Sequence, residues 1–273
     1  AKTSEHAGTG GFNQLHVYDN HIYLGYKDQL VGVNPREKTI IETNVPMTLG
    51  LRGGLVKDHK LYTIDRLTNV LEVDLDTHDY EYKEDKMRGG NLGLHSIGTA
   101  NSKDIFITAY PGGPKAARFN IEDETVDIYN QGQAEGMIAG HGNDMYFGIY
   151  TGAVIERLNS ETLDQEVLFN LKDTYGQDRP YYMDFIPEED LLLIGTIPDY
   201  KVLGGVMALY NVKTEELTVY EDVIENQSIV SLAKKGQTIF GSTAIEGGLG
   251  IDPIAEKAVI FEFDLTSGEL VSS

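Results

Sequence analysis

Residues 146–164 read YFGIYTGAVIERLNSETLD, and this stretch decides the fold. A short apolar segment, Tyr146-Phe147-Gly148, is followed by a polar loop and then by a second apolar segment that ends at Asn159. Asn and Asp suit the end of such a segment because their side chains hydrogen-bond the backbone two residues further on and close a tight turn. The stretch therefore predicts two antiparallel strands and a turn into a third.

The same pattern recurs six times along the chain. Each copy has an apolar segment that ends in Asn or Asp, and these anchors lie about 40 to 53 residues apart. The six anchors are Asn34, Asp74, Asn120, Asn159, Asn211 and Asp264. An aromatic or aliphatic pair precedes each anchor, and a polar turn with another short apolar segment precedes the pair. Four short strands in every 40 to 50 residues, with little helix signal, indicate a propeller blade.

We therefore predict an all-β fold, a six-bladed β-propeller of four-stranded antiparallel blades that forms one domain over residues 1–273. The predicted blades span residues 11–47, 48–87, 88–132, 133–178, 179–226 and 227–273. The last copy supplies its own fourth strand at 269–272, so no strand is expected to be borrowed from the other end of the chain. Seven blades are the alternative if a terminal blade lies outside this sequence.

The charge and the composition exclude several classes of function. The chain has 22 basic and 43 acidic residues, a formal charge of −21, and such a surface repels nucleic acid and anionic membranes. There is no cysteine, which excludes disulfides and thiolate metal sites, and the histidines form no HExxH or HxH motif. We predict no cofactor, no metal and no membrane insertion. The absence of cysteine favours an extracellular or cell-surface location, with the cytoplasm as the alternative.

Two segments carry a resemblance to a known group of proteins: residues 146–163 and FEFDLTSGEL at 261–270. They resemble the bacterial propellers with quinoprotein-like, virginiamycin B lyase-like and gluconolactonase-like repeats. The Trp-Asp motif of WD40 blades is missing because the chain has no Trp, and the double glycine of kelch blades does not repeat. The resemblance implies an architecture and no single activity, since the group includes lyases, lactonases and binding modules.

One face of the predicted propeller is the better candidate for a site. The turns between the third and fourth strands are short and uniform. The loops between the second and third strands vary, and the longest, 244–257, is rich in glycine. Variable loops on a rigid frame usually carry function, although they can also merely cap a channel.

Arginine and tyrosine gather on the predicted loops of this face. Guanidinium groups bind carboxylate, sulfate or phosphate, and tyrosine rings stack on sugars. Each arginine can instead pair with a nearby acid. The predicted ligand-binding residues are Arg52, Arg66, Arg88, His95, Tyr110, Tyr150, Arg179, Tyr181, Tyr182 and Tyr200.

Three functions follow from this face, and whether the chain is an enzyme stays open. The first is an extracellular or cell-surface module that binds a carbohydrate or another anionic ligand. The second is a polysaccharide lyase on a uronate-containing glycan, in which Arg179 neutralises the carboxylate while His95 and Tyr181 transfer protons. The third is a protein-interaction scaffold. A gluconolactonase-like hydrolase with a divalent cation is less favoured, because only Asp184 and Glu135 are suitably placed acids.

Overall fold

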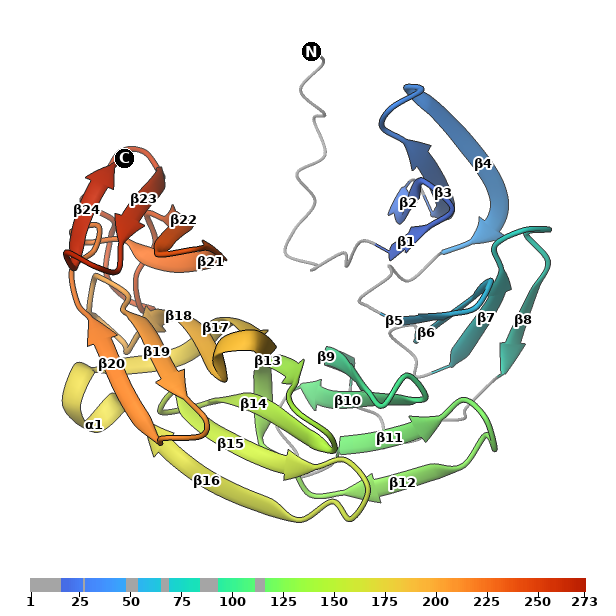
Figure 1. The fold of residues 1–273 in the computed structure, drawn as a ribbon, viewed down its shortest axis with the longest axis horizontal. Coiled ribbons are helices and arrows are strands. Elements are labelled where there is room, and N and C mark those ends of the chain that lie inside the picture. Colours follow the sequence, from blue (N-terminus) through green and yellow to red (C-terminus); the bar gives the residue numbers. More distant parts are fainter. Residues whose placement is uncertain (1–15, 27, 48–53, 65–68, 84–92, 111–115) are drawn as a thin grey trace. The chain divides into compact units, whose positions relative to one another are not determined.

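The computed structural model describes residues 16–26, 28–47, 54–64, 69–83, 93–110 and 116–273. The chain divides into two compact units, residues 1–130 and 131–273, and each is described by itself. In the described residues every sheet has four antiparallel strands, and there are three such sheets in each unit (Figure 1). The six sheets confirm the predicted all-β fold with six four-stranded blades.

Unit 1 holds blades 1 to 3. Blade 1 consists of β1 (His16–Tyr18), β2 (His21–Tyr26), β3 (Gln29–Asn34) and β4 (Thr39–Pro46). Blade 2 consists of β5 (Gly54–Lys57), β6 (Lys60–Ile64), β7 (Val70–Asp74) and β8 (Tyr80–Lys83). Blade 3 consists of β9 (Gly93–Ala100), β10 (Asp104–Tyr110), β11 (Ala116–Asn120) and β12 (Val126–Tyr129).

Unit 2 holds blades 4 to 6. Blade 4 consists of β13 (Gln133–Ala139), β14 (Asp144–Tyr150), β15 (Val154–Asn159) and β16 (Gln165–Asn170). Blade 5 consists of β17 (Gln177–Ile186), β18 (Leu191–Pro198), β19 (Met207–Asn211) and β20 (Glu216–Tyr220). Blade 6 consists of β21 (Ser228–Lys235), β22 (Thr238–Ala244), β23 (Ile260–Asp264) and β24 (Glu269–Ser272). The helical segments of this unit are α1 (Lys172–Tyr175) and the 3-10 turn η1 (Pro187–Glu189). Neither the short α1 nor any other helix in the described residues has the length and apolar character that a membrane span needs.

The predicted Asn/Asp turns are present in all six blades. In each, the anchor oxygen accepts the backbone N–H groups two and three residues further on, as Asn159 Oδ1 does from Glu161 (3.0 Å) and Thr162 (3.1 Å). The fourth residue after every anchor has a positive φ, from 56° at Glu124 to 72° at Gly268. This shared geometry reverses the chain between the third and fourth strands of every blade.

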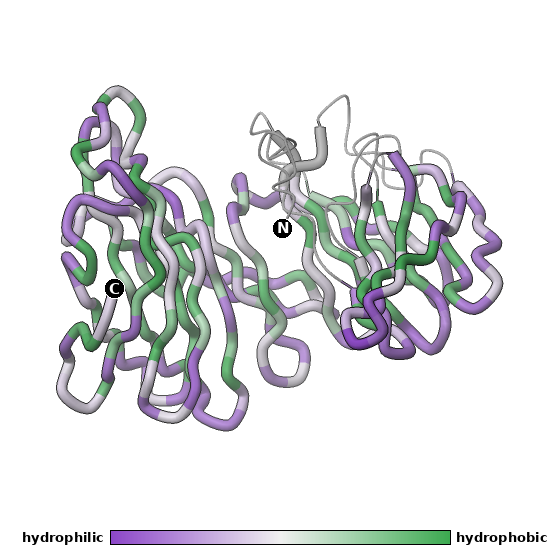
Figure 2. Tube along the Cα trace, turned by 90° about the horizontal axis from the view of Figure 1, so that it is seen from above, coloured by the Kyte–Doolittle hydropathy of each residue, from purple (hydrophilic) through white to green (hydrophobic). Residues whose placement is uncertain are grey.

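Apolar cores lie between neighbouring blades within each unit. In unit 2, Ile155 of blade 4 packs in one cluster with Leu192 and Ile194 of blade 5. Leu193, which points the other way from the same strand, packs with Phe261 of blade 6. The inner strands are therefore buried on both faces, which explains why they are continuously apolar, as Figure 2 shows by the green strands between purple turns.

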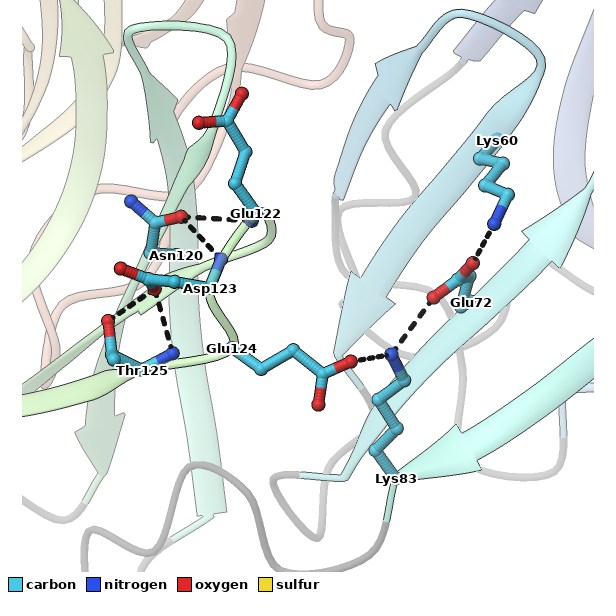
Figure 3. Close-up of polar contacts among 8 residues, drawn as sticks. All are labelled: Lys60, Glu72, Lys83, Asn120, Glu122, Asp123, Glu124 and Thr125. Carbon is cyan, nitrogen blue, oxygen red and sulfur yellow. Dashed lines mark hydrogen bonds and ion pairs between the residues drawn. The ribbon is translucent and has the colours of Figure 1, made fainter.

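A network of ion pairs joins blade 2 to the β11–β12 hairpin of blade 3 (Figure 3). Glu72 accepts hydrogen bonds from Lys60 (2.5 Å) and Lys83 (3.0 Å), and Lys83 also pairs with Glu124. Burial acts in the opposite direction, but the two lysines outweigh it and hold the pKa of Glu72 below its usual value. The turn anchored by Asn120 places Glu124 for this contact.

Candidate functional site

A hollow of about 240 Å³ lies in unit 2, where three segments meet: the start of β17, the end of β18 with its following loop, and the loop after β22. Its lining residues are Asp178, Arg179, Tyr181, Ile197, Pro198, Tyr200, Gly247, Gly248 and Leu249. Tyr200 and Leu249 are 51% and 60% exposed, so the rim is open to solvent. These segments belong to the variable loop face that the sequence indicates.

β-Bulges bring several of these side chains to the hollow. In the pairing of β17 with β18 the register shifts between Gln177 and Arg179 and again between Pro180 and Tyr182. Asp178 and Tyr181 are therefore extra residues in their strand. A bulge breaks the alternation of side chains between the two faces and re-aims them, which is why bulges are frequent at binding sites. Tyr181 consequently lines the hollow, whereas its neighbour Tyr182 packs against the core between blades 5 and 6.

The same bulge position is used in other blades. In blade 4 the register shifts between Ala134 and Gly136, which makes Glu135 the extra residue. In blade 3 Leu94 pairs with Ala109 and Ser96 with Thr108, so His95 is the extra residue there. His95, Glu135 and Tyr181 thus hold equivalent positions in three successive repeats.

Arg179 is held from two sides. Its Nη1 donates a hydrogen bond to Glu135 Oε1 at 2.7 Å, and the side chain of Glu135 is only 6% exposed. Its guanidinium carbon lies 4.1 Å from the centre of the Tyr150 ring, a cation–π geometry. Gln133 Nε2 donates to the same Glu135 oxygen at 2.9 Å and helps to fix the carboxylate. The arginine therefore enters the hollow with a defined orientation and a neutralised charge.

Two tyrosines at this site, Tyr150 and Tyr181, have raised pKa values. The hydroxyl of Tyr150 lies 3.2 Å from that of Tyr200, and this hydrogen bond raises the pKa of Tyr150. Burial, with the nearby charge of Glu135, raises the pKa of Tyr181. Tyr150 and Tyr181 consequently remain protonated at neutral pH, and their hydroxyls can donate as well as accept hydrogen bonds.

A second ion cluster includes Asp178, one of the residues that line the hollow. Lys172 of α1 lies 2.9 Å from Asp199 Oδ2 and 3.4 Å from Asp178 Oδ1. The Asp178 side chain is 3% exposed, and its Oδ1 also accepts the backbone N–H of Gly152 at 2.8 Å. The hydrogen bond from Lys172 lowers the pKa of Asp199. These contacts fix the ends of β17 and β18 relative to each other.

Close backbone contact between two loops forms the remaining wall. Gly248 N donates to Val202 O at 2.9 Å, and Lys201 N donates to Leu249 O at 3.0 Å. A Cβ on Gly248 would lie 1.7 Å from Asp199 O, so only glycine permits this approach. The glycine-rich sequence of loop 244–257 thus has a structural cause in the site itself.

The structure brings four of the predicted site residues together: Tyr150, Arg179, Tyr181 and Tyr200. Tyr182 lies apart from them in the core, where burial raises its pKa to about 12. His95 and Tyr110 lie in β9 and β10 of unit 1, and only their backbone is described. Arg52, Arg66 and Arg88 lie outside the described residues.

Sequence reasoning missed three contributors. Lys172 and Asp178 were not expected because their ion pair depends on a short helix and a bulge. Glu135 was considered only as a metal ligand, and it pairs with Arg179 instead. Asp184 is the other acid that the sequence offered as a metal ligand. Burial raises the pKa of Asp184, and its carboxylate accepts a hydrogen bond from the backbone N–H of Phe185. Within the described part of the chain, no three His, Asp or Glu side chains are grouped as a metal site.

Solved structures similar to this chain are propeller-type folds. The extracellular domain of BT4673 from B. thetaiotaomicron superposes with a TM-score of 0.67 at 15% identity, covering 98% of this chain and 37% of that one. The WD40 repeats of RRP9 superpose with a TM-score of 0.64 at 10% identity, covering 92% of this chain and 76% of that one. A chain of the nidogen/laminin complex superposes with a TM-score of 0.57 at 10% identity, covering 92% of each chain. The chain thus spans little more than a third of the BT4673 domain.

No protein-family model matches the chain, and no curated protein matches its sequence. The similarity to solved structures at these low identities establishes the propeller-type fold and nothing beyond it.

Proposed function

We propose that the chain is a non-catalytic binding module that holds a carbohydrate in the hollow of unit 2. The observation that carries the proposal is one open hollow lined by Arg179, Tyr181 and Tyr200. A third tyrosine, Tyr150, lies beside it and contacts both Arg179 and Tyr200. Tyrosine rings offer flat apolar surfaces for the C–H faces of sugar rings, and their hydroxyls bind sugar hydroxyls.

The size of the hollow is consistent with a short stretch of glycan. Its volume of about 240 Å³ is below the range of about 300–1,000 Å³ typical of sites that enclose a drug-sized ligand. With its exposed rim it suits one or two units of a longer chain, with the remainder in solvent. Such a site fits a module that binds either the terminal sugar units of a glycan or a short internal stretch of it.

An extracellular or cell-surface location agrees with this proposal. Two structurally similar proteins from B. thetaiotaomicron, BT4673 and BT3049, are extracellular domains of putative hybrid two-component systems. The resemblance to quinoprotein-like, virginiamycin B lyase-like and gluconolactonase-like repeats is compatible with the same role. A single domain over residues 1–273 remains our prediction for the whole chain.

A glycan array probed with the purified chain, followed by calorimetric titration of each bound glycan, tests the proposal. We expect Tyr200→Ala to weaken binding at least tenfold, a change of about 1.4 kcal/mol. Tyr80→Ala is the matched control, because Tyr80 of β8 is similarly exposed at 48% and lies in unit 1. Binding to no glycan, or equal binding by Tyr200→Ala and the wild type, would overturn the proposal. Release of an unsaturated uronate product would instead establish the lyase.

A further inference from the structure

The positive charges at the hollow are already matched by carboxylates. Among the described residues at the site and their ion-pair partners, the cations are Arg179 and Lys172. The carboxylates are those of Glu135, Asp178 and Asp199. Two of these acids are almost fully buried, with side-chain exposures of 6% and 3%. These described groups therefore carry one negative charge more than positive charges.

The flanking loops do not reverse this balance. Loop 198–206 carries Asp199 and Lys201, and loop 244–257 carries three acids, Glu246, Asp252 and Glu256, against one lysine. The whole chain has a formal charge of −21. An anionic ligand would approach against this field and would have to compete with the buried Glu135 for Arg179.

From this balance we infer that the ligand is a neutral, hydroxyl-rich saccharide and not a uronate or sulfated one. This inference rests on the proposed function and names the class of ligand for the same site. A cationic sugar would find one face of the Tyr150 ring already occupied, because the Arg179 guanidinium lies over it. The hydroxyl groups of a neutral sugar are not repelled by the negative field and do not have to displace Glu135 from Arg179.

In this arrangement Arg179 acts as a hydrogen-bond donor and not as a charge partner. A guanidinium has five N–H groups, and within the described residues one of them, on Nη1, is used by Glu135. The others are available to sugar hydroxyl or ring oxygens. Glu135 is a positioning residue: it orients the guanidinium and cancels the charge that would otherwise attract an acid.

Matched ligands with the same backbone and different charge provide the test. Galacturonate oligosaccharides in fully methyl-esterified and de-esterified form share one backbone, and each carboxyl group is a neutral methyl ester in the first and a carboxylate in the second. Neutral gluco-, xylo-, manno- and galacto-oligosaccharides, each beside its uronate-substituted counterpart, complete the panel. We expect the neutral member of the bound pair to bind the wild type at least tenfold more tightly. We also expect little change between low and high salt, because salt screens only charged pairs.

A charge-removing variant tests the role of Glu135. Glu135→Gln keeps an amide oxygen for Arg179 but removes the negative charge, so the preference for the neutral sugar should fall at least tenfold. Glu166→Gln is the control, since Glu166 pairs with Arg157 in the same unit and does not line the hollow. The wild-type preference is measured independently, so the inference stays testable if Glu135→Gln does not fold.

The outcomes separate the two proposals. Tighter binding of the uronate member, lost in Tyr200→Ala, would overturn the neutral-sugar inference and leave the binding site in place. Binding of no saccharide by the folded wild type would overturn the proposed function and this inference with it. An unchanged preference in folded Glu135→Gln would refute the role given to Glu135.

Discussion

Replacing Thr196 with Val removes one hydroxyl from the structure that supports the hollow. Thr196 is fully buried at the end of β18. Its Oγ1 donates to Gln177 Oε1 at 2.6 Å and accepts the backbone N–H of Val206 at 2.8 Å. Valine has nearly the same shape, so the substitution leaves the packing intact and deprives two buried polar atoms of their partners.

The magnitude follows from those two atoms. Gln177 and Val206 are each 2% exposed, so water does not readily replace the lost hydroxyl. A buried donor or acceptor without a partner costs about 1–3 kcal/mol, so for two such atoms we expect a loss of about 2–6 kcal/mol in the free energy of unfolding. With a urea m-value of about 2 kcal/mol per molar, the midpoint should fall by about 1–3 M.

The repeat supplies an internal comparison. In blade 6, Thr243 Oγ1 donates to Gln227 Oε1 at 2.5 Å and accepts the N–H of Val259 at 2.9 Å. Thr243→Val should therefore cost a similar amount. Thr218→Val, at an exposed position of β20, is the control and should change the midpoint little. Urea unfolding followed by circular dichroism measures all three. A loss below about 0.5 kcal/mol for Thr196→Val would refute the reasoning.

Three further changes have defined outcomes. Burial lowers the pKa of His16 to about 4, and among the described residues its Nε2 has no hydrogen-bond partner. Below pH 6.5 His16 is protonated in the unfolded chain but not in the folded chain, so the free energy of unfolding falls as the pH falls. His16→Phe lacks this titration. Between pH 7 and pH 5, urea unfolding should show that its free energy of unfolding falls by about 2 kcal/mol less than that of the wild type. Gly248→Ala should abolish saccharide binding in titration through its clash with Asp199 O, while Ile254→Ala, 69% exposed in the same loop, should not. Leu163 has a φ of 62°, so Leu163→Gly should raise the urea midpoint by an amount equivalent to about 0.5–1 kcal/mol, and a lowered midpoint would contradict this.

Much of the fold could be predicted because its determinants are local and repeated. Asn159 and its five counterparts close their turns with atoms two and three residues away, so their chemistry is visible in the sequence. The conformation of the fourth residue was less visible. A positive φ is expected of Gly268 but not of Leu163, which adopts it because the surrounding turn requires it.

The site could be predicted only in outline, because its geometry depends on irregularities. Tyr181 and Tyr182 were both assigned to the loop face, and a bulge sends one to the hollow while the other packs in the core. The partner of Arg179 lies 44 residues earlier in the chain, and neither spacing nor periodicity identifies it. The repeat determines which loops share a face, whereas the contacts among those loops depend on the three-dimensional structure.

The most direct test of the central claim is amide hydrogen exchange of the wild-type chain, with and without the neutral oligosaccharide panel. We predict slower exchange at 197–201 and 247–249, the segments that line the hollow. Unchanged exchange throughout the chain, or slowing confined to residues 16–129, would contradict the claim that unit 2 carries the binding site.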